Sequence, residues 1–175
     1  MKGRFVLGLT LAAVLAVSAC SKEDSATDPS PVDQGSATML EGPVVYGAAD
    51  FSFDGPDTLP AGTSDITMDN VGANEHELII VELAKNQDWT DEEFVQFVKD
   101  NPQAQPKWAT VIAGTKEPSA PGDSGSVQFV DMSGEGQPEV MPDASLEPGT
   151  YLLMCFVGDK GPHAGMGMVK KITVS

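Results

Sequence analysis

The chain has 175 residues, 41% of them hydrophobic, which suffices for one small globular domain with processed or disordered ends. Its 18 glycines and 13 prolines favour many turns, as in an all-β protein. Its formal charge of −16 repels nucleic acids and anionic lipid headgroups, so DNA, RNA and peripheral membrane binding are excluded, while basic partners or cations are attracted.

The first 19 residues are typical of a secretory signal. Lys2 and Arg4 form a short positive start, an apolar run extends from Phe5 to Val17, and small residues follow it. This run of about 13 residues is shorter than the roughly 20 that a membrane-spanning helix needs. Residues 1–19 are therefore predicted to be removed on export, and an uncleaved anchor helix is the alternative.

Cys20 ends a segment, Val-Ser-Ala-Cys, that resembles the bacterial lipobox. The resemblance implies that the chain is cut just before Cys20 and that Cys20 carries the lipid. Residues 20–42 contain almost no large apolar residue before Met39, and we expect them to form a disordered tether. The sequence thus predicts an exported protein, attached to the cell envelope through its lipid only and facing the periplasm or the cell exterior.

Residues 43–175 have the pattern of a single all-β domain. Turns rich in glycine and proline are expected at 59–62, 120–123 and 147–149. Short β-branched and aromatic runs between such turns predict strands. These strands are expected at 44–46, 50–53, around Ile66 and Met68, and at 78–83, 108–112, 126–131, 151–157 and 168–174.

One segment carries a clear helix signal. Thr90 to Glu93 forms a capping box, Phe94, Phe97 and Val98 follow at helical spacing, and Asn101-Pro102 ends the pattern. Many short strands together with one inserted helix predict a β-sandwich.

Cys155 has no partner within the chain if Cys20 carries the lipid. An unpaired cysteine in an exported protein is an intermolecular disulfide, a buried thiol or a metal ligand. His163 follows Cys155 by eight residues, and Met168 follows His163 by five, in a loop rich in glycine and proline that joins two predicted strands. The only other histidine, His76, lies far upstream after a strand and a loop.

Two imidazoles, one thiolate and one thioether are the ligand set of a blue-copper site. Each of these residues taken alone is more often a core or turn residue, but together they predict one copper ion per chain, bound by His76, Cys155, His163 and Met168. Met166 competes with Met168 for the weak axial place, and strand alternation would point both methionines the same way.

Beyond these four residues the chain resembles the cupredoxin family. The region of the family's first ligand resembles Phe53, Thr58-Leu59-Pro60-Ala61-Gly62 and the segment from Asn70 to His76. The family's strand before the cysteine resembles the segment from Leu146 to Tyr151, which leads into Cys155. The resemblance covers roughly residues 44–175, apart from an insertion near 85–120. It implies a Greek-key β-sandwich with copper at one end, two imidazole ligands, a Cys155 thiolate and an axial Met168. Glu77 stands where many cupredoxins have asparagine.

The expected function is electron transfer at the cell envelope by a mononuclear blue-copper protein. A second copper centre for catalysis would need further histidines, so we expect no enzyme. The resemblance implies transfer through the edge of His163 to a redox partner protein in a weak, transient contact, and the charge predicts a basic docking surface on that partner. We expect a monomer. The alternatives are an envelope copper carrier or buffer without a redox partner, and a structural module that has lost its metal.

Overall fold

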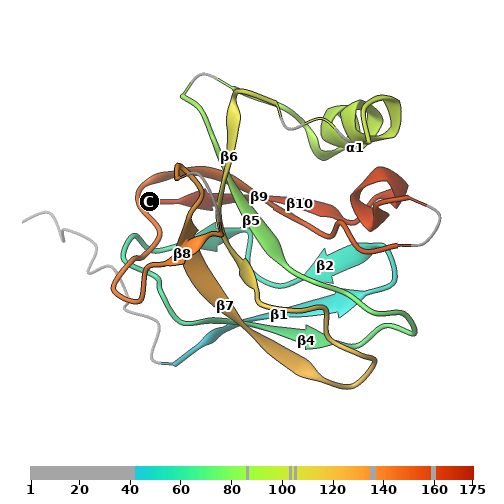
Figure 1. The fold of residues 1–175 in the computed structure, drawn as a ribbon, viewed down its shortest axis with the longest axis horizontal. Coiled ribbons are helices and arrows are strands. Elements are labelled where there is room, and N and C mark those ends of the chain that lie inside the picture. The colour runs from blue at the N-terminus through green and yellow to red at the C-terminus, as the bar shows by residue number, and fades with distance from the viewer. Residues whose placement is uncertain (1–41, 86, 103, 105, 135–136, 159–160) are drawn as a thin grey trace, which may run out of the picture. The chain divides into compact units, whose positions relative to one another are not determined.

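The computed structural model describes residues 42–175 except 86, 103, 105, 135–136 and 159–160 (Figure 1). The predicted signal, Cys20 and the tether up to residue 41 lie outside the described residues. The described elements, in chain order, are β1 (Val44–Ala49), β2 (Ser52–Asp54), β3 (Thr58–Leu59), β4 (Ile66–Asn70), β5 (Ile79–Leu83), α1 (Asp91–Asp100), β6 (Ala109–Thr115), β7 (Ser124–Asp131), β8 (Glu139–Val140), β9 (Gly149–Met154), the 3-10 helix η1 (His163–Met166) and β10 (Val169–Val174).

The strands form one hydrogen-bonded sheet that curls into a sandwich, in the order β2-β1-β4-β7-β6-β5-β9-β10-β3, with β8 also paired to β7. Strand β7 joins the two layers, because its first half pairs with β4 at Ser126 and its second half pairs with β6 at Phe129. Two pairs are parallel, β1 with β4 and β3 with β10. The predicted β-sandwich with one inserted helix is confirmed.

The core has two parts that lie on opposite faces of β9. Tyr151, Leu153 and Cys155 point into the main core between the layers, whereas Leu152 and Met154 pack in a second cluster with the helix. Alternate residues of a strand face opposite sides, so both faces of β9 are buried. Because both faces are buried, the sequence of β9 is a nearly continuous apolar run rather than an alternating pattern.

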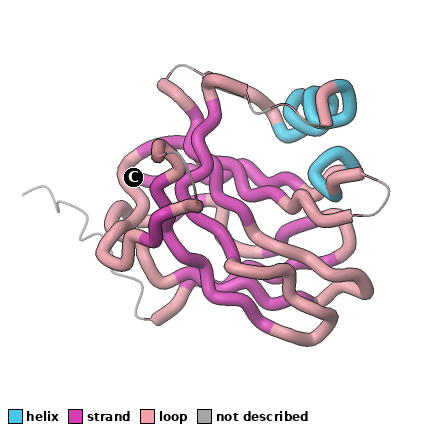
Figure 2. Tube along the Cα trace, viewed as in Figure 1, coloured by secondary structure: helices cyan, strands magenta, loops and turns pink. Residues whose placement is uncertain are grey.

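Helix α1 begins and ends where the sequence signals lie. The Thr90 side chain accepts a hydrogen bond from the Glu93 backbone N–H at 3.2 Å, and the Glu93 carboxylate accepts one from the Thr90 N–H at 2.9 Å, which completes the predicted capping box. Phe94 and Val98 are the buried residues of the helix. The helix packs on β10 and on η1, and so it lies beside the loop that carries His163. Figure 2 shows the two helices side by side in cyan.

The structure differs from the sequence expectations in three short elements. Strands β3 and β8 have two residues each, too few for a detectable period, and η1 occupies part of a loop that glycine and proline had marked as irregular. Strand β9 also ends at Met154, before Cys155, rather than at residue 157. Among the described helices, none is long and apolar enough to cross a membrane.

Candidate metal centre

Neighbouring strands bring His76, Cys155 and His163 to one end of the sandwich. Strand β5 pairs with β9 in antiparallel register, Ile79 opposite Met154, so the segment before β5 lies beside the segment after β9. Strand β9 also pairs with β10, Val169 opposite Met154, and η1 lies in the connection between them. His76 comes just before β5, Cys155 just after β9, and His163 begins η1.

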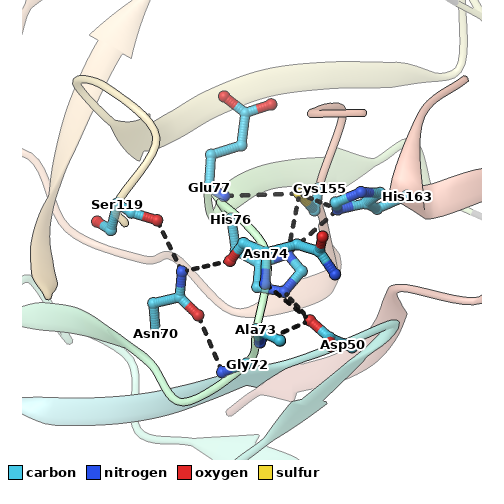
Figure 3. Close-up of polar contacts among 10 residues, drawn as sticks. All are labelled: Asp50, Asn70, Gly72, Ala73, Asn74, His76, Glu77, Ser119, Cys155 and His163. Atoms are coloured by element: carbon cyan, nitrogen blue, oxygen red, sulfur yellow. Dashed lines mark hydrogen bonds and ion pairs between the residues drawn. The ribbon is translucent and has the colours of Figure 1, made fainter. Parts of the chain in front are cut away.

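The possible ligand atoms of these three residues lie close together. The two Nδ1 atoms of His76 and His163 are 3.2 Å apart, and the Cys155 Sγ lies 3.9 Å from the first and 3.6 Å from the second. All three residues are buried, and their possible ligand atoms lie within 4.8 Å of one another. Figure 3 shows the three side chains converging on one point.

One ion can reach all three atoms. In zinc sites, metal–nitrogen bonds are about 2.0–2.1 Å long and metal–sulfur bonds about 2.3 Å. Two nitrogens bound to one ion can therefore be up to about 4.1 Å apart, and a nitrogen and a sulfur up to about 4.4 Å. Each of the three separations is shorter than its limit. Soft sulfur combined with imidazole also fits copper better than calcium or magnesium, which prefer oxygen.

His76 is held by its backbone. It forms an isolated β-bridge with Ser119, its N–H donating to the Ser119 carbonyl at 3.1 Å and its carbonyl accepting from the Ser119 N–H at 2.7 Å. The buried Asn70 side chain donates to the same Ser119 carbonyl at 2.7 Å and to the Asn74 carbonyl at 2.8 Å, and it accepts from the Gly72 N–H at 3.0 Å. Asn70 thereby fixes both ends of the loop that leads into His76.

The far side of the His76 ring contacts Asp50. The Nε2 atom lies 3.1 Å from Asp50 Oδ1, and that oxygen also accepts from the backbone N–H groups of Ala73 at 3.0 Å and Asn74 at 3.2 Å. Hydrogen bonds from the side chains of Asn74 and His76, with smaller contributions from those two N–H groups, hold the pKa of the Asp50 carboxyl below its usual range. An ionised carboxylate only accepts hydrogen bonds, so in a neutral ring this contact favours the tautomer with the proton on Nε2 and the lone pair on Nδ1.

Cys155 is a buried thiol whose sulfur faces backbone N–H groups. The Glu77 N–H points at its Sγ from 3.5 Å. Burial raises the pKa of the Cys155 thiol, and the N–H groups of Glu77 and Val157 only partly oppose this rise. A metal that binds here must therefore displace the thiol proton.

Glu77 links the two ligand segments. Its carboxylate accepts a hydrogen bond from the Phe156 N–H at 3.0 Å, while its own N–H points at Cys155. Burial raises the pKa of the Glu77 carboxyl. Like an asparagine, Glu77 can accept a hydrogen bond that links the two segments. Unlike asparagine, it also brings a carboxyl group.

The described residues between Cys155 and His163 are held by short-range contacts. The His163 N–H donates to the Val157 carbonyl at 3.0 Å, and the Ala164 N–H donates to the Cys155 carbonyl at 2.7 Å. Gly158 has a φ of 144°, and a Cβ there would collide with the Gly161 carbonyl oxygen and with the His163 ring, so only glycine fits. Burial and the neighbouring His76 lower the pKa of His163, which keeps its ring neutral at pH 7.

The two methionines face different surroundings. Met168 is fully buried in the main core that also contains Cys155, whereas Met166 is 44% exposed. The expectation that both point the same way is wrong, because Met166 belongs to η1 and Gly167, with a φ of 113°, turns the chain before β10 begins. The burial of Met168 agrees with the preference for it as the axial ligand.

Sequence reasoning missed Asp50 and Phe51. Both lie in the turn between β1 and β2, and Phe51 places its ring edge-on to His163 with ring centroids 5.4 Å apart. No local motif marks these residues, because the histidines that they contact lie 26 residues or more further along the chain. The sequence pattern predicts a strand at 50–53 that includes both residues, whereas in the structure they form the turn before β2.

Comparison with protein-family models finds no match, and neither does comparison with curated proteins. The solved structures that resemble the chain include the following three. Auracyanin from the photosynthetic bacterium Roseiflexus castenholzii is 20% identical, with 75% of this chain and 94% of that chain covered and a TM-score of 0.46. Auracyanin A from Chloroflexus aurantiacus, described as a "blue" copper protein, is 20% identical, with 77% and 100% covered and a TM-score of 0.42. Rusticyanin is 22% identical, with 75% and 77% covered and a TM-score of 0.39.

Fold and ligand group together define the class: a cupredoxin-type β-sandwich that carries a His–Cys–His group at one end, as the resemblance in the sequence predicts. Each of these three TM-scores lies below 0.5.

Proposed function

We propose that this protein is a mononuclear blue-copper electron-transfer protein, anchored to the cell envelope through Cys20. The observation that carries the proposal is the buried group of two imidazole nitrogens and one sulfur, all within reach of one ion. His76, Cys155 and His163 would be the strong ligands and Met168 the weak axial one. When bound, copper in such a site supplies reversible one-electron exchange.

The protein's contribution is to hold the ligands before the metal arrives. The β5–β9 register and the Ser119 bridge fix His76, and the loop hydrogen bonds fix His163. Ligands that are held by the fold need little movement when the charge of the ion changes. Little movement favours fast electron transfer.

His163 is the expected exit for the electron. His163 is 7% exposed, whereas His76 is fully buried. Of the two histidines, His163 therefore lies nearer the surface. Phe51, in edge contact with the His163 ring, is 40% exposed, and Met166, on the same 3-10 helix, is 44% exposed. A partner would meet an apolar rim around His163, which suits a small, short-lived contact.

The decisive experiment adds copper to the full chain purified in detergent and records metal content with optical and electron-paramagnetic-resonance spectra. We expect one copper per chain and an intense sulfur-to-copper band, which Cys155→Ser abolishes because the band needs the copper–sulfur bond. The absence of bound copper, or a spectrum unchanged by Cys155→Ser, would contradict the proposal. Bound copper that exchanges no electrons with any redox protein would favour the copper carrier instead.

A further inference from the structure

The contact between Asp50 and His76 connects the two layers of the sandwich at the metal centre. Asp50 lies in the turn that follows β1, in the layer of β1, β2 and β4, whereas His76 leads into β5, in the layer of β5, β9 and β10. The 3.1 Å separation between Nε2 and Oδ1 is that of a hydrogen bond. As Figure 3 shows, Asp50 lies on the side of the His76 ring away from Cys155 and His163.

The turn that presents Asp50 has an unusual backbone. Phe51 has a φ of 66° and is the only non-glycine residue with positive φ among the described residues. That conformation is unfavourable for a bulky residue and persists only where its surroundings enforce it. Here the turn places two consecutive side chains on the two imidazoles, Asp50 on His76 and Phe51 on His163.

Gly72 leaves the space that the pair occupies. A Cβ at this position would lie 2.6 Å from Asp50 Oδ1 and 2.8 Å from His76 Nε2, too close for either atom to stay where it is. The backbone at Gly72 therefore lies so close to the Asp50–His76 hydrogen bond that no side chain fits at this position. Three separate features thus converge on this contact: the backbone donors to Asp50, the strained turn and the glycine.

We propose that Asp50 is a positioning residue of the metal centre, which fixes the ring proton of His76 on Nε2, directs the Nδ1 lone pair at the ion and lowers the reduction potential. The inference rests on the proposed function. A carboxylate that accepts a hydrogen bond from a ligating imidazole orients the ring and makes it a stronger donor. Its negative charge also favours the more positively charged oxidised ion over the reduced one.

Two variants separate the charge of Asp50 from its contact with His76. Asp50→Asn removes the charge and keeps an oxygen that can accept the same hydrogen bonds. Gly72→Ala keeps the charge and both partners but forces them apart. Asp131→Asn is the matched control, because Asp131 also accepts a backbone N–H in a turn, from Ser133 at 2.7 Å, but contacts no possible ligand.

The full chain is purified in detergent, with ¹⁵N-labelled histidine, and measured with and without copper. The chain contains only two histidines, so the ring signals are few, and His163→Gln assigns them. Without metal, we expect wild-type His76 as a single Nε2–H tautomer and a mixture of tautomers in Gly72→Ala. With copper, we expect Asp50→Asn to weaken Cu(II) binding about 10- to 100-fold and both variants to raise the reduction potential, whereas Asp131→Asn matches the wild type.

The outcomes distinguish this inference from the proposed function. If the wild type binds copper with its sulfur band, but Asp50→Asn and Gly72→Ala leave tautomer and potential at the wild-type values, Asp50 has no positioning role and the proposed function stands. If the wild type binds no copper, the proposed function and this inference both fail. Circular dichroism establishes that each variant is folded, and Gly72→Ala decides the matter if Asp50→Asn does not fold.

Discussion

At the scale of single residues, the acidity of Cys155 governs how a metal binds. The buried thiol has a pKa above its usual value of 9.0, so it is protonated at neutral pH. His163, with its lowered pKa, is already neutral there and releases no proton. Metal binding at pH 7 to 9 therefore exchanges the ion for the thiol proton.

We accordingly expect copper affinity to rise about tenfold per pH unit between pH 7 and 9, because one proton leaves for each ion that binds. Calorimetric titration in buffers of different ionisation enthalpy measures that proton directly. Cys155→Ser, which has no thiol proton to lose, should remove this dependence. An affinity of the wild type that is the same at pH 7 and pH 9 would exclude the thiolate as a ligand.

The raised pKa of Cys155 also makes the stability of the metal-free chain depend on pH, but here a rise in pH is unfavourable. The unfolded thiol ionises near its usual value of 9.0, before the folded one does, so rising pH above that value favours unfolding. The stability that the protonated thiol contributes is present below this pH and is lost as the pH rises through the folded pKa.

Met168 and Met166 provide a second test at this scale. Met168→Leu should keep the sulfur-to-copper band and raise the reduction potential, because the axial bond is weak and its loss favours cuprous copper. Met166→Leu, at an exposed site, is the control and should change neither. Voltammetry with the optical spectrum measures both. A shift with Met166→Leu and none with Met168→Leu would reverse the assignment.

The residues that sequence alone singled out are those whose chemistry is rare in the chain. With two histidines and only one cysteine besides Cys20, the group His76, Cys155 and His163 had few competitors. Asp50 could not be singled out, because it is one of 26 acidic residues and only the folded layers bring it to His76. The orientation of Met166 depended on Gly167, whose backbone conformation no periodicity reveals.

At the scale of elements, α1 is the part most fully predicted. Its signals, the capping box and Asn101-Pro102, act within a few residues of one another, so tertiary context was not needed to locate them. The two-residue strands β3 and β8 are the opposite case, since they exist only through their partners β10 and β7. Periodicity over two residues carries no information.

The cap of α1 is testable on its own. Thr90→Ala should lower the free energy of unfolding by about 1 kcal/mol, because the first turn loses its side-chain acceptor. Thr90→Ser keeps an oxygen at the same place and is the control. Urea denaturation measures both. Because no cap atom touches the possible ligands, the copper spectrum should be the same in all three proteins, and a spectral change in Thr90→Ala would show that the helix supports the site.

At the scale of the whole molecule, charge is the dominant feature. A formal charge of −16 should attract a basic redox protein, and salt should weaken that attraction because the screening length falls from about 10 Å at 0.1 M to about 3 Å at 1 M. We expect electron exchange with a basic redox protein to slow as salt rises, in stopped-flow measurements, and exchange with an acidic one to accelerate. If the exchange rates with the basic and the acidic redox protein are both independent of salt concentration, the charge serves solubility only.

Export and lipidation belong to the whole chain as well. We expect the mature protein to begin at Cys20 and to carry acyl chains, since the apolar run ends in Val-Ser-Ala-Cys. Mass spectrometry of the native N-terminus measures this, with Cys20→Ser as a control that should accumulate uncut. An intact Met1, or a cut elsewhere that leaves a free Cys20 thiol, would refute the anchor.

The pairing of β5 with β9 has a consequence for the order of assembly. Cys155 and His163 are near neighbours in the chain, but His76 is 79 residues from Cys155 and reaches it only when those two strands have paired. Such distant pairing is a slow part of folding. A chain whose β5 and β9 have not yet paired therefore offers an incoming ion a thiol and one imidazole but no complete site. The three-ligand site forms only on folding, and an ion bound there would then link β5 to β9.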